Sequence, residues 1–474
     1  MARVIGGDIP ALAAAAPNRP ALVCEEDVLS RARLAERIGG LAAFLAENTA
    51  PGAGVALAMG NAPGLVAAFF ACAVSGRQAL VYDPGWPAPY RAAIDAALAP
   101  ALTLNDLPDT LPAPFPPPPR CEAAFYVGFT SGSTGLPKGY RRCHRSWIDS
   151  FTVSAVEFGL GEEDVVLAPG GLAASLHLYA IVHAVHVGAR AVMMRQFHPR
   201  RALRLIARHG VTALYATPTQ LQMLLEAGAG GCLPTLRLLM VSGAKWRPQT
   251  RAATRALFPN AGIAEFYGAS ETSFVTVAHP DEAVPPGAVG RPAHGVALRI
   301  RDAAGRDLPA GEVGAIWVGS TLLFDAYACG AAPETRREGG FLTIGDHGRL
   351  DAAGFLYLHG REKRMLVTSG MNVYPEEIEA VLARLDGIEE AAVFGAPDEL
   401  RGVELVAVLR GSFDERDLRA ACRALLPAAK IPRRFLALEN WPRTSGGKAD
   451  LRALEKLVLE RLELERLGLE RLGR

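Results

Sequence analysis

The sequence has almost no excess of charge of either sign. Its 50 Lys and Arg residues nearly match its 49 Asp and Glu residues, which leaves a formal net charge of +1. A chain with interspersed acids and bases has no broad electrostatic footprint for nucleic acid or for an anionic membrane surface. The function is therefore expected to come from local groups of residues, and nucleic acid is not expected among the partners.

The sequence also lacks paired cysteines. Its seven cysteines lie far apart, without CxxC pairs or the Cys/His spacing of a zinc finger. An odd number of scattered cysteines is typical of reduced, buried thiols rather than of a disulfide framework. The cysteines favour a reduced, cytoplasmic protein. His183 and His186 could face together on a helix, but no third ligand is apparent in the sequence, so no structural metal is expected.

No segment has the pattern of a secretory signal or of a membrane span. The N-terminal sequence MARVIGGDIP lacks the charged start, the apolar stretch and the cleavage site of a signal peptide. Residues 55–74 are apolar, but glycine, asparagine and proline between positions 60 and 64 interrupt them. The remaining run, residues 65–74, is too short to cross a bilayer and is predicted to be a buried helix.

Length and patterning predict an α/β fold of at least two domains. A chain of 474 residues exceeds what one ordinary core supports. Apolar helix-like segments alternate with short strand-like runs, first over residues 21–100 and then through VVLAP, ARAVMM, ALYATP, LRLLMVSG and IAEFYG. This alternation predicts a large N-terminal domain of layered βα subdomains, with a more β-rich portion from Val313. Residues 108–120, PDTLPAPFPPPPR, are too rich in proline for regular structure and are expected to form a stiff surface connector.

A second, smaller module begins near Arg361. From there the sequence alternates helix-like and strand-like segments in a compact α+β pattern that is long enough for its own core. We predict an N-terminal domain of residues 1–362 and a C-terminal domain of residues 363–474. From Leu459 the tail repeats LERL with a period of five, which gives no single apolar face and predicts a frayed or loosely docked helix.

The loop from Thr130 to Gly139, TSGSTGLPKG, has the composition of a phosphate-binding loop. It follows the strand-like run AAFYVGF, and helical spacing begins after Arg145, so the loop is expected to join a strand to a helix. Its glycines allow tight curvature, its Ser and Thr hydroxyls donate hydrogen bonds, and Lys138 adds a cation. The loop is not a Walker P-loop, because the glycine spacing differs and Gly139 follows the lysine in place of Ser or Thr.

This string resembles the phosphate-binding motif of the adenylate-forming superfamily, which includes acyl- and aryl-CoA synthetases, nonribosomal peptide synthetase adenylation domains and firefly luciferase. The resemblance is closest in type to a free-standing acyl-CoA synthetase. It implies ATP binding by Thr130, Ser131, Gly132, Ser133, Thr134, Gly135 and Lys138.

The segment EFYGASET, from Glu265, resembles a second element of the same superfamily. The resemblance implies that Tyr267 stacks on adenine, that Gly268 and Ser270 contact the nucleotide, and that Glu271 holds Mg²⁺. Ser270 stands where the superfamily usually has threonine. A carboxylate is the hard oxygen ligand that Mg²⁺ beside ATP phosphates requires.

Two further elements follow in the superfamily's order. TIGDHGRL, from Thr343, resembles the element whose aspartate binds the ribose hydroxyls, which implies that role for Asp346. GREKRMLVTSGMNVYPEEIE resembles the hinge region, and it implies that Arg361 binds the nucleotide, Lys363 is the hinge, and Ser369 and Gly370 lie on the side that receives CoA.

The segment PRTSGGKADLRAL resembles the C-terminal catalytic element of the superfamily. The resemblance implies that Lys448 reaches the substrate carboxylate and the α-phosphate oxygens, so that the C-terminal domain is a mobile lid that carries this lysine. Together with Lys138 and Glu271, Lys448 completes the catalytic residues that the resemblance implies.

The acid-binding side is less distinct in the sequence. His177 falls where the superfamily has an aromatic or histidine gate, although a core histidine fits the pattern equally well. VSGAKW resembles a strand end that lines the substrate, which makes Gly243, Ala244 and Lys245 candidates; Lys245 can also point to solvent. No aspartate occurs in LAASLHLYA, which disfavours an α-amino acid substrate.

The resemblance implies an AMP-forming carboxylic acid:CoA ligase with ATP, Mg²⁺ and CoA as cofactors. A carboxylic acid would be activated as its acyl-adenylate with release of pyrophosphate, and the acyl group would then pass to the thiol of CoA. One alternative is a stand-alone adenylating enzyme that loads the phosphopantetheine arm of a carrier protein. Another is a catalytically inactive nucleotide-binding regulator, against which the complete set of Glu271, Asp346, Arg361 and Lys448 argues.

Overall fold

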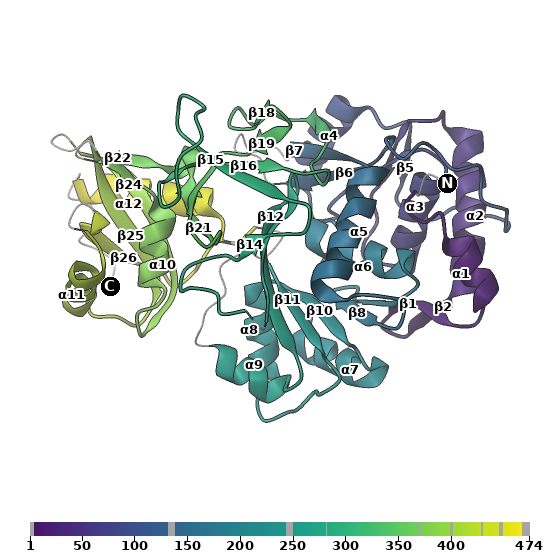
Figure 1. Ribbon diagram of the computed structural model, residues 1–474, viewed down its shortest axis with the longest axis horizontal. Helices are drawn as coiled ribbons and strands as arrows, with labels where there is room; N and C mark the ends of the chain where they lie inside the picture. Colours follow the sequence, from purple (N-terminus) through teal and green to yellow (C-terminus); the bar gives the residue numbers. More distant parts are fainter. Residues whose placement is uncertain are drawn as a thin grey trace. The chain divides into compact units, whose positions relative to one another are not determined.

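The chain divides by its internal contacts into two compact units. The computed structural model describes residues 4–130, 138–242, 250–280, 282–368, 371–398, 402–427, 430–444 and 449–466. The first unit comprises Met1–Arg299, Trp317–Ile344 and Asp351–Leu356, and the second comprises Ile300–Ile316, Gly345–Leu350 and Tyr357–Arg474 (Figure 1). The predicted α/β fold with a large N-terminal and a smaller C-terminal part is confirmed. The boundary at Lys363 stays a prediction.

The first unit contains a nine-stranded sheet with a parallel centre. Strands β1, β9, β8, β10, β11 and β12 run parallel, and their buried residues are mostly aliphatic, as both faces of the sheet are covered. The strand order is β14 (Arg291–Pro292), β13 (Ser273–Ala278), β12 (Gly262–Ala269), β11 (Leu238–Val241), β10 (Ala213–Ala216), β8 (Val165–Ala168), β9 (Arg190–Met193), β1 (Pro20–Cys24) and β2 (Asp27–Ser30).

A second, six-stranded sheet in the same unit carries the β6–β7 hairpin, which flanks the glycine-rich segment. Its order is β17 (Ala326–Cys329), β7 (Lys138–Cys143), β6 (Ala124–Thr130), β4 (Gln78–Val81), β3 (Gly54–Leu57) and β5 (Leu102–Leu104). The helices of this unit are α1 (Ile9–Ala15), α2 (Arg31–Asn48), α3 (Pro63–Val74), α4 (Ala88–Leu98), α5 (His144–Phe158), α6 (Ser175–His186), α7 (Pro199–His209), α8 (Pro218–Ala227) and α9 (Arg251–Leu257).

Helix α3 confirms the buried helix predicted over residues 65–74. Every residue from Leu65 to Val74 is buried, and the helix contacts β3, β4 and β6 of one sheet and β1 of the other. A helix that is apolar on all sides is stable in water only when both of its faces are covered. In the part of the chain that the structure describes, no helix is long and apolar enough to cross a membrane.

The expectation that the glycine-rich loop joins a strand to a helix is wrong. The loop connects β6 to β7, which pair antiparallel with Thr130 opposite Lys138, and α5 begins only at His144. In the segment KGYRRC the residues Lys138, Tyr140 and Arg142 are buried on alternate positions, which is a strand pattern despite its charges. In the sequence, the loop therefore stands between two paired strands instead of between a strand and a helix.

The proline-rich connector and the β-rich portion agree with the sequence. Residues 108–120 contain no helix or strand. From residue 297 onwards a six-stranded sheet forms, with the order β18 (Arg336–Glu338), β19 (Phe341–Thr343), β16 (Gly314–Gly319), β20 (Asp346–Leu350) and β21 (Leu356–Arg361), while β15 (Ala297–Arg301) pairs with β16.

The second unit has its own α+β core. The strands are β24 (Ile388–Asp398), β25 (Gly402–Gly411) and β26 (Arg434–Ala437), with the hairpin β22 (Leu366–Thr368) and β23 (Met371–Val373). The helices are the short η2 (Glu362–Arg364) and α10 (Pro375–Leu382), α11 (Glu415–Leu425) and α12 (Leu451–Arg466). Leu454 and Val458 dock α12 onto the sheet and Leu462 packs against the same cluster, whereas Leu459 and Leu464 are exposed, so the described part of the repeated tail continues this helix. Residues 467–474 lie outside the described part.

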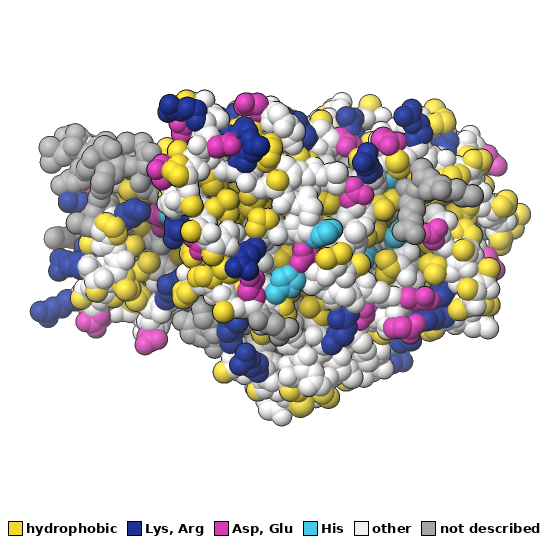
Figure 2. Space-filling model, in the orientation of Figure 1, with side chains coloured by type: hydrophobic (Ala, Val, Ile, Leu, Met, Phe, Trp, Pro, Cys, Tyr) yellow, Lys and Arg dark blue, Asp and Glu magenta, His cyan; other side chains and the backbone are white. Residues whose placement is uncertain are grey.

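Charged side chains of both signs are interspersed on the face shown in Figure 2, as the net charge of +1 leads one to expect.

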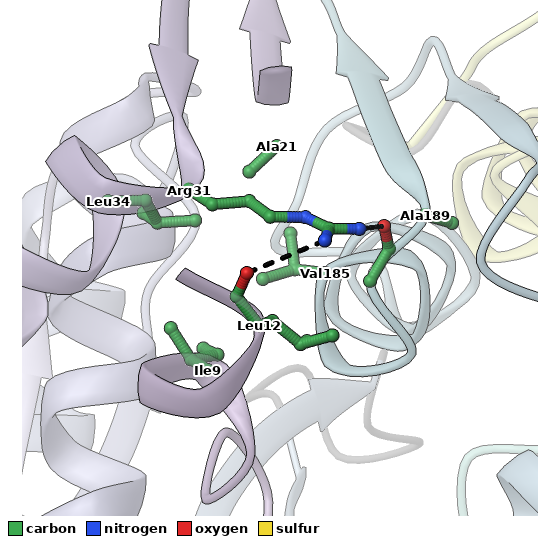
Figure 3. Close-up of a pocket in the computed structure, with 8 residues that line it drawn as sticks. Ile9, Leu12, Ala21, Arg31, Leu34, Val185 and Ala189 are labelled. Atoms are coloured by element: carbon green, nitrogen blue, oxygen red, sulfur yellow. Dashed lines mark hydrogen bonds between the residues drawn. The ribbon is translucent and has the colours of Figure 1, made fainter. Parts of the chain in front are cut away.

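A small cavity in the first unit is lined chiefly by apolar side chains around the buried Arg31 (Figure 3). The Arg31 guanidinium donates to the Gly188 carbonyl at 2.6 Å and to the Glu162 carboxylate at 2.7 Å. Arg31 therefore ties the N-terminal helices to the turn after α6, and the cavity has no lining residue in common with the candidate site.

Candidate active site

The paired ends of β6 and β7 carry a buried hydroxyl and a buried cation. Thr130 ends β6, and its Oγ1 is buried without a hydrogen-bond partner among the described residues. Lys138 begins β7 with 8% of its surface exposed. Buried polar groups are normally paired, and an anion beside Lys138 would supply an acceptor for this hydroxyl. Ser131, Gly132, Ser133, Thr134 and Gly135 lie outside the described residues.

The hairpin of β12 and β13 positions the second element. A bulge separates Tyr267 from Gly268, and a Cβ at Gly268 would lie 2.0 Å from the Ser273 carbonyl oxygen, so only glycine fits there. Ser273 has a backbone φ of 58°, which residues other than glycine rarely adopt. Such backbone strain persists only where the surrounding structure holds it, and it is common at functional sites.

Glu271 is buried in the turn between these strands, with 6% of its surface exposed. Its Oε1 accepts a hydrogen bond from the Tyr327 hydroxyl at 2.8 Å, and its backbone carbonyl accepts one from the Phe324 amide at 2.8 Å. Burial, followed by the Glu271 carboxylate, raises the pKa of Tyr327 above its ordinary value, so the phenol keeps its proton and acts as the donor.

Arg142 fixes the same turn from behind. Its guanidinium is 2% exposed and donates to the Ser270 carbonyl at 2.9 Å, the Leu322 carbonyl at 2.7 Å and the Ser146 hydroxyl at 3.1 Å. The Ser270 hydroxyl lies 3.0 Å from that of Ser175 at the start of α6. The element around Glu271 is thus attached to both the phosphate-loop strand and the helix that carries His177.

His177 is a buried imidazole whose proton can be assigned from its neighbours. The Gln220 amide oxygen accepts from the Thr217 amide at 3.0 Å, so the Gln220 NH₂ faces His177 Nε2 at 3.3 Å and donates to it. The proton then resides on His177 Nδ1, which is buried and has no partner within the described ranges. Burial lowers the pKa of His177 to about 4, which keeps the ring neutral. A Cβ at Gly170 would lie 2.1 Å from His177 Nε2, so the ring needs glycine beside it.

Asp346 and Arg361 meet in the second unit. Arg361 Nε donates to Asp346 Oδ1 at 2.9 Å, with the Asp346 side chain buried and the Arg361 side chain about half exposed (48%). Both belong to strands, β20 and β21, and η2 with Lys363 follows directly. Of the other predicted site residues, Gly243, Ala244, Lys245, Ser369, Gly370 and Lys448 lie outside the residues that the structure describes.

The sequence analysis missed two residues of this arrangement, Tyr327 and Arg142. Tyr327 is 56 positions from Glu271 along the chain, and nothing local in AYAC distinguishes it. Arg142 is equally hidden in the sequence, because its charge conceals the buried alternation that it shares with Lys138 in β7. In the described part of the chain, no three His, Cys, Asp or Glu side chains are grouped to hold a metal ion.

Two family models of nucleotide-dependent enzymes match this chain. The family model described as AMP-binding enzyme matches residues 10–106 and 92–328, and the model described as AMP-binding enzyme C-terminal domain matches residues 377–448. The uncharacterized acyl-CoA ligase YhfT of Bacillus subtilis (strain 168) is 39% identical over 328 residues, which is 69% of this chain and 67% of that relative.

Two further relatives differ in what their names say they acylate. The fatty acid–[acyl-carrier-protein] ligase ScoC of Streptomyces coeruleorubidus is 32% identical over 349 residues, which is 69% of this chain and 66% of ScoC. The o-succinylbenzoate CoA synthetase of Bacillus subtilis, solved in complex with its acyl-adenylate intermediate, superposes with a TM-score of 0.85 at 25% identity and covers 94% of this chain and 97% of that one.

Proposed function

This chain belongs to the AMP-binding enzyme family, and we propose that it is an AMP-forming carboxylic acid:CoA ligase. The adenylate-forming superfamily predicted from the sequence motifs is confirmed. The enzyme activates a carboxylic acid with ATP, releases pyrophosphate, and passes the acyl group to the thiol of CoA. The observation that carries the proposal is the cluster in which Lys138 and Glu271 both contact Tyr327, beside the unpartnered hydroxyl of Thr130.

The donor groups fit magnesium-bound ATP. Mg²⁺ in nucleotide sites is typically held by one or two carboxylates, with water and phosphate oxygens as the remaining ligands, and Glu271 offers such a carboxylate. When bound, Mg²⁺ would supply charge neutralisation at the phosphates. Lys138 and the Thr130 hydroxyl would contact phosphate oxygens, as would the rest of the loop as far as Gly135.

Three residues of the sequence motifs are our candidates for contacts with the nucleoside. We assign adenine stacking to Tyr267, the ribose hydroxyls to Asp346, and a further nucleotide contact to Arg361; Gly268 and Ser270 form the turn beside them. The pairing of Arg361 with Asp346 supports this assignment, because it fixes the carboxylate in one orientation.

The chemistry demands positioning and charge neutralisation more than a side-chain nucleophile. A carboxylate oxygen attacks the α-phosphorus of ATP, the bond to the β-phosphate oxygen breaks, and pyrophosphate leaves with the electron pair. A thiol then attacks the acyl carbon and AMP leaves. We assign the lysine that contacts the carboxylate and the α-phosphate to Lys448, on a mobile domain of residues 363–474 with its hinge at Lys363. Ser369 and Gly370 would then lie on the thiol-receiving side.

We place the acid beside His177. The unpartnered Nδ1–H of this neutral ring is a donor that a carboxylate or an acyl oxygen can accept from, which favours the gate over a purely structural histidine. Gly243, Ala244 and Lys245 remain our candidates for the wall of the acid site. We also propose a cytoplasmic location, because all seven cysteines are free, as in a reducing compartment.

A carrier protein is the alternative acceptor, and the name of ScoC supports that alternative. Both readings share the nucleotide chemistry and differ only in which phosphopantetheine thiol attacks. Pyrophosphate release and thioester formation should therefore be measured across aliphatic, aromatic and dicarboxylic acids, with CoA or with holo-carrier proteins. Acid-dependent pyrophosphate release with thioester formation on CoA supports the proposal. Thioester formation only on a carrier selects the alternative, and no acid-dependent release with any acid contradicts both.

A matched variant separates the activity of this site from that of a contaminant. Glu271→Gln keeps the shape of the side chain but removes the charge that would hold Mg²⁺, and it should lower pyrophosphate release by about a hundredfold or more. Glu163→Gln is the control, since Glu163 is an exposed carboxylate of the same unit that pairs with Arg19, and the rate should be unchanged. Equal rates in all three proteins would contradict the site.

A further inference from the structure

We propose that Tyr327 is a positioning residue that holds the Glu271 carboxylate and the Lys138 ammonium in one fixed geometry for metal-bound ATP. The inference rests on the proposed function, because it assigns a ligand to the site that Glu271 and Lys138 form. It adds a residue to which neither the sequence motifs nor the comparisons assign a role.

The hydroxyl of Tyr327 determines which oxygen of Glu271 is engaged. A carboxylate only accepts hydrogen bonds, so the contact at 2.8 Å is a donation from Tyr327 to Glu271 Oε1. The Thr335 hydroxyl lies 3.3 Å from the Tyr327 oxygen and is placed to donate to it. The chain of donors runs from Thr335 through Tyr327 to Glu271, and it engages Oε1 of the carboxylate and not Oε2.

The ring of Tyr327 contacts the cation. The Lys138 Nζ lies 5.1 Å from the ring centroid, within the range in which the negative face of an aromatic ring attracts an ammonium group. Lysine is flexible, with four rotatable bonds, and the aromatic face reduces the number of orientations its ammonium samples before ATP binds. The neutral side chain of Tyr327 thus contacts both Lys138 and Glu271.

The backbone around Tyr327 is held on both sides. Strand β17 pairs with β7 so that Tyr327 lies opposite Tyr140, two residues after Lys138. The Phe324 amide donates to the Glu271 carbonyl at 2.8 Å, which joins the segment before β17 to the metal-binding turn. Tyr327 is therefore anchored to the phosphate-loop strand and to the Glu271 turn at once.

The two contacts of Tyr327 predict separable effects on ligand binding. The hydroxyl acts on Glu271, so removing it should weaken only the metal-dependent part of ATP binding. The ring acts on Lys138, so removing the ring should also weaken binding of ATP without metal. A side chain with only a structural role would lower stability without changing the metal dependence.

The experiment is calorimetric titration of the full-length protein with ATP, in Mg²⁺ and in EDTA, without acid or CoA. Tyr327→Phe should raise the Kd for ATP in Mg²⁺ by about tenfold, the equivalent of about 1.4 kcal/mol for a hydrogen bond to a charged group. In EDTA its Kd should equal that of the wild type. Tyr327→Leu should raise the Kd in both conditions, and Thr335→Val should give a smaller increase in Mg²⁺ alone.

Tyr82→Phe provides the matched control. The Tyr82 hydroxyl donates to the Asp95 carboxylate at 2.7 Å in the same unit. The substitution therefore removes the same kind of hydrogen bond away from the site, and the Kd values for ATP in Mg²⁺ and in EDTA should both stay unchanged. If Tyr327→Phe folds and has the wild-type Kd in Mg²⁺, the inference is wrong. If Tyr327→Phe does not fold, the test is the Kd of Thr335→Val for ATP in Mg²⁺, which should exceed that of the wild type, and a wild-type value would contradict the inference. Absence of ATP binding to the wild type would instead contradict the proposed function itself.

Discussion

The two units hold opposite charges at their candidate ligand groups in different ways. In the first unit Lys138 and Glu271 are both buried, and a neutral tyrosine contacts each of them. In the second unit Asp346 and Arg361 bond to each other directly, and Arg361 is half exposed. A direct ion pair with an exposed partner contributes little to stability. Both carboxylates are therefore oriented before the ligand arrives, the first by a buried neutral tyrosine and the second by a half-exposed arginine.

The largest expected effect tests whether the second unit supplies a catalytic group that the first lacks. Lys448→Ala should lower acyl-adenylate formation by about a hundredfold or more, because it removes a cation from the developing phosphate charge. Conversion of a supplied acyl-adenylate to the CoA thioester should change little. Both half-reactions are measured by chromatography of the adenylate and the thioester. An equal loss in both would contradict the assignment of Lys448 to the first step alone.

Acid should affect the first unit before the second. Burial lowers the pKa of His144 and His183 to about 3 and that of His177 to about 4, from an ordinary 6.5. The unfolded chain then binds more protons than the folded chain below pH 6.5, so stability is complete above 6.5 and decreases as the pH falls towards 4. Each imidazole contributes a slope of about 1.4 kcal/mol per pH unit within that window.

Hydrogen exchange measured in each unit at pH 7 and pH 5 tests this difference. The histidines of the second unit, His347 and His359, are paired with Tyr374 and Glu377 instead of being enclosed by apolar side chains. Protection of α6 should therefore fall at pH 5 by more than that of β24. An equal loss of protection in both elements would contradict the assignment to the buried imidazoles.

Removing the guanidinium behind the Glu271 turn should destabilise the first unit. Arg142→Met leaves the Ser270 and Leu322 carbonyls without their donor, so the free energy of unfolding in urea should fall by about 3 kcal/mol. Arg208→Met is the control, since Arg208 is exposed and pairs with Glu26 at the surface, and it should change stability little. Equal changes in the two variants would show that Arg142 is not a structural anchor.

The smallest effect is expected at the exposed ion pair of the second unit. Arg361→Gln should change the unfolding free energy little, because the Arg361 side chain is already half exposed. The Kd for ATP should rise by about threefold to tenfold, since Asp346 loses the group that orients it. Titration calorimetry and urea unfolding measure the two quantities. A stability loss as large as that of Arg142→Met would remove the distinction between the two units.

The sequence predicted the fold class because the alternation of apolar segments follows directly from strands buried on both faces. It failed at β7, where Lys138 and Arg142 are buried in a strand and their charge conceals the alternation. The motifs singled out Lys138, Glu271, Asp346 and Arg361 because these residues lie in short contiguous strings, and their roles stay predictions. Tyr327 and Arg142 act across 56 and 128 positions of the chain, so only the folded structure shows their contacts.

The central claim is that the carboxylate itself attacks the α-phosphorus of ATP. If a substrate acid is labelled with oxygen-18 in its carboxyl group and turned over with ATP, Mg²⁺ and CoA, one labelled oxygen should remain bonded to phosphorus when AMP leaves. Mass spectrometry of the nucleotide product measures this transfer directly. The account predicts AMP that carries one oxygen-18 atom, and unlabelled AMP, or the label in inorganic phosphate with ADP as the nucleotide product, would contradict it.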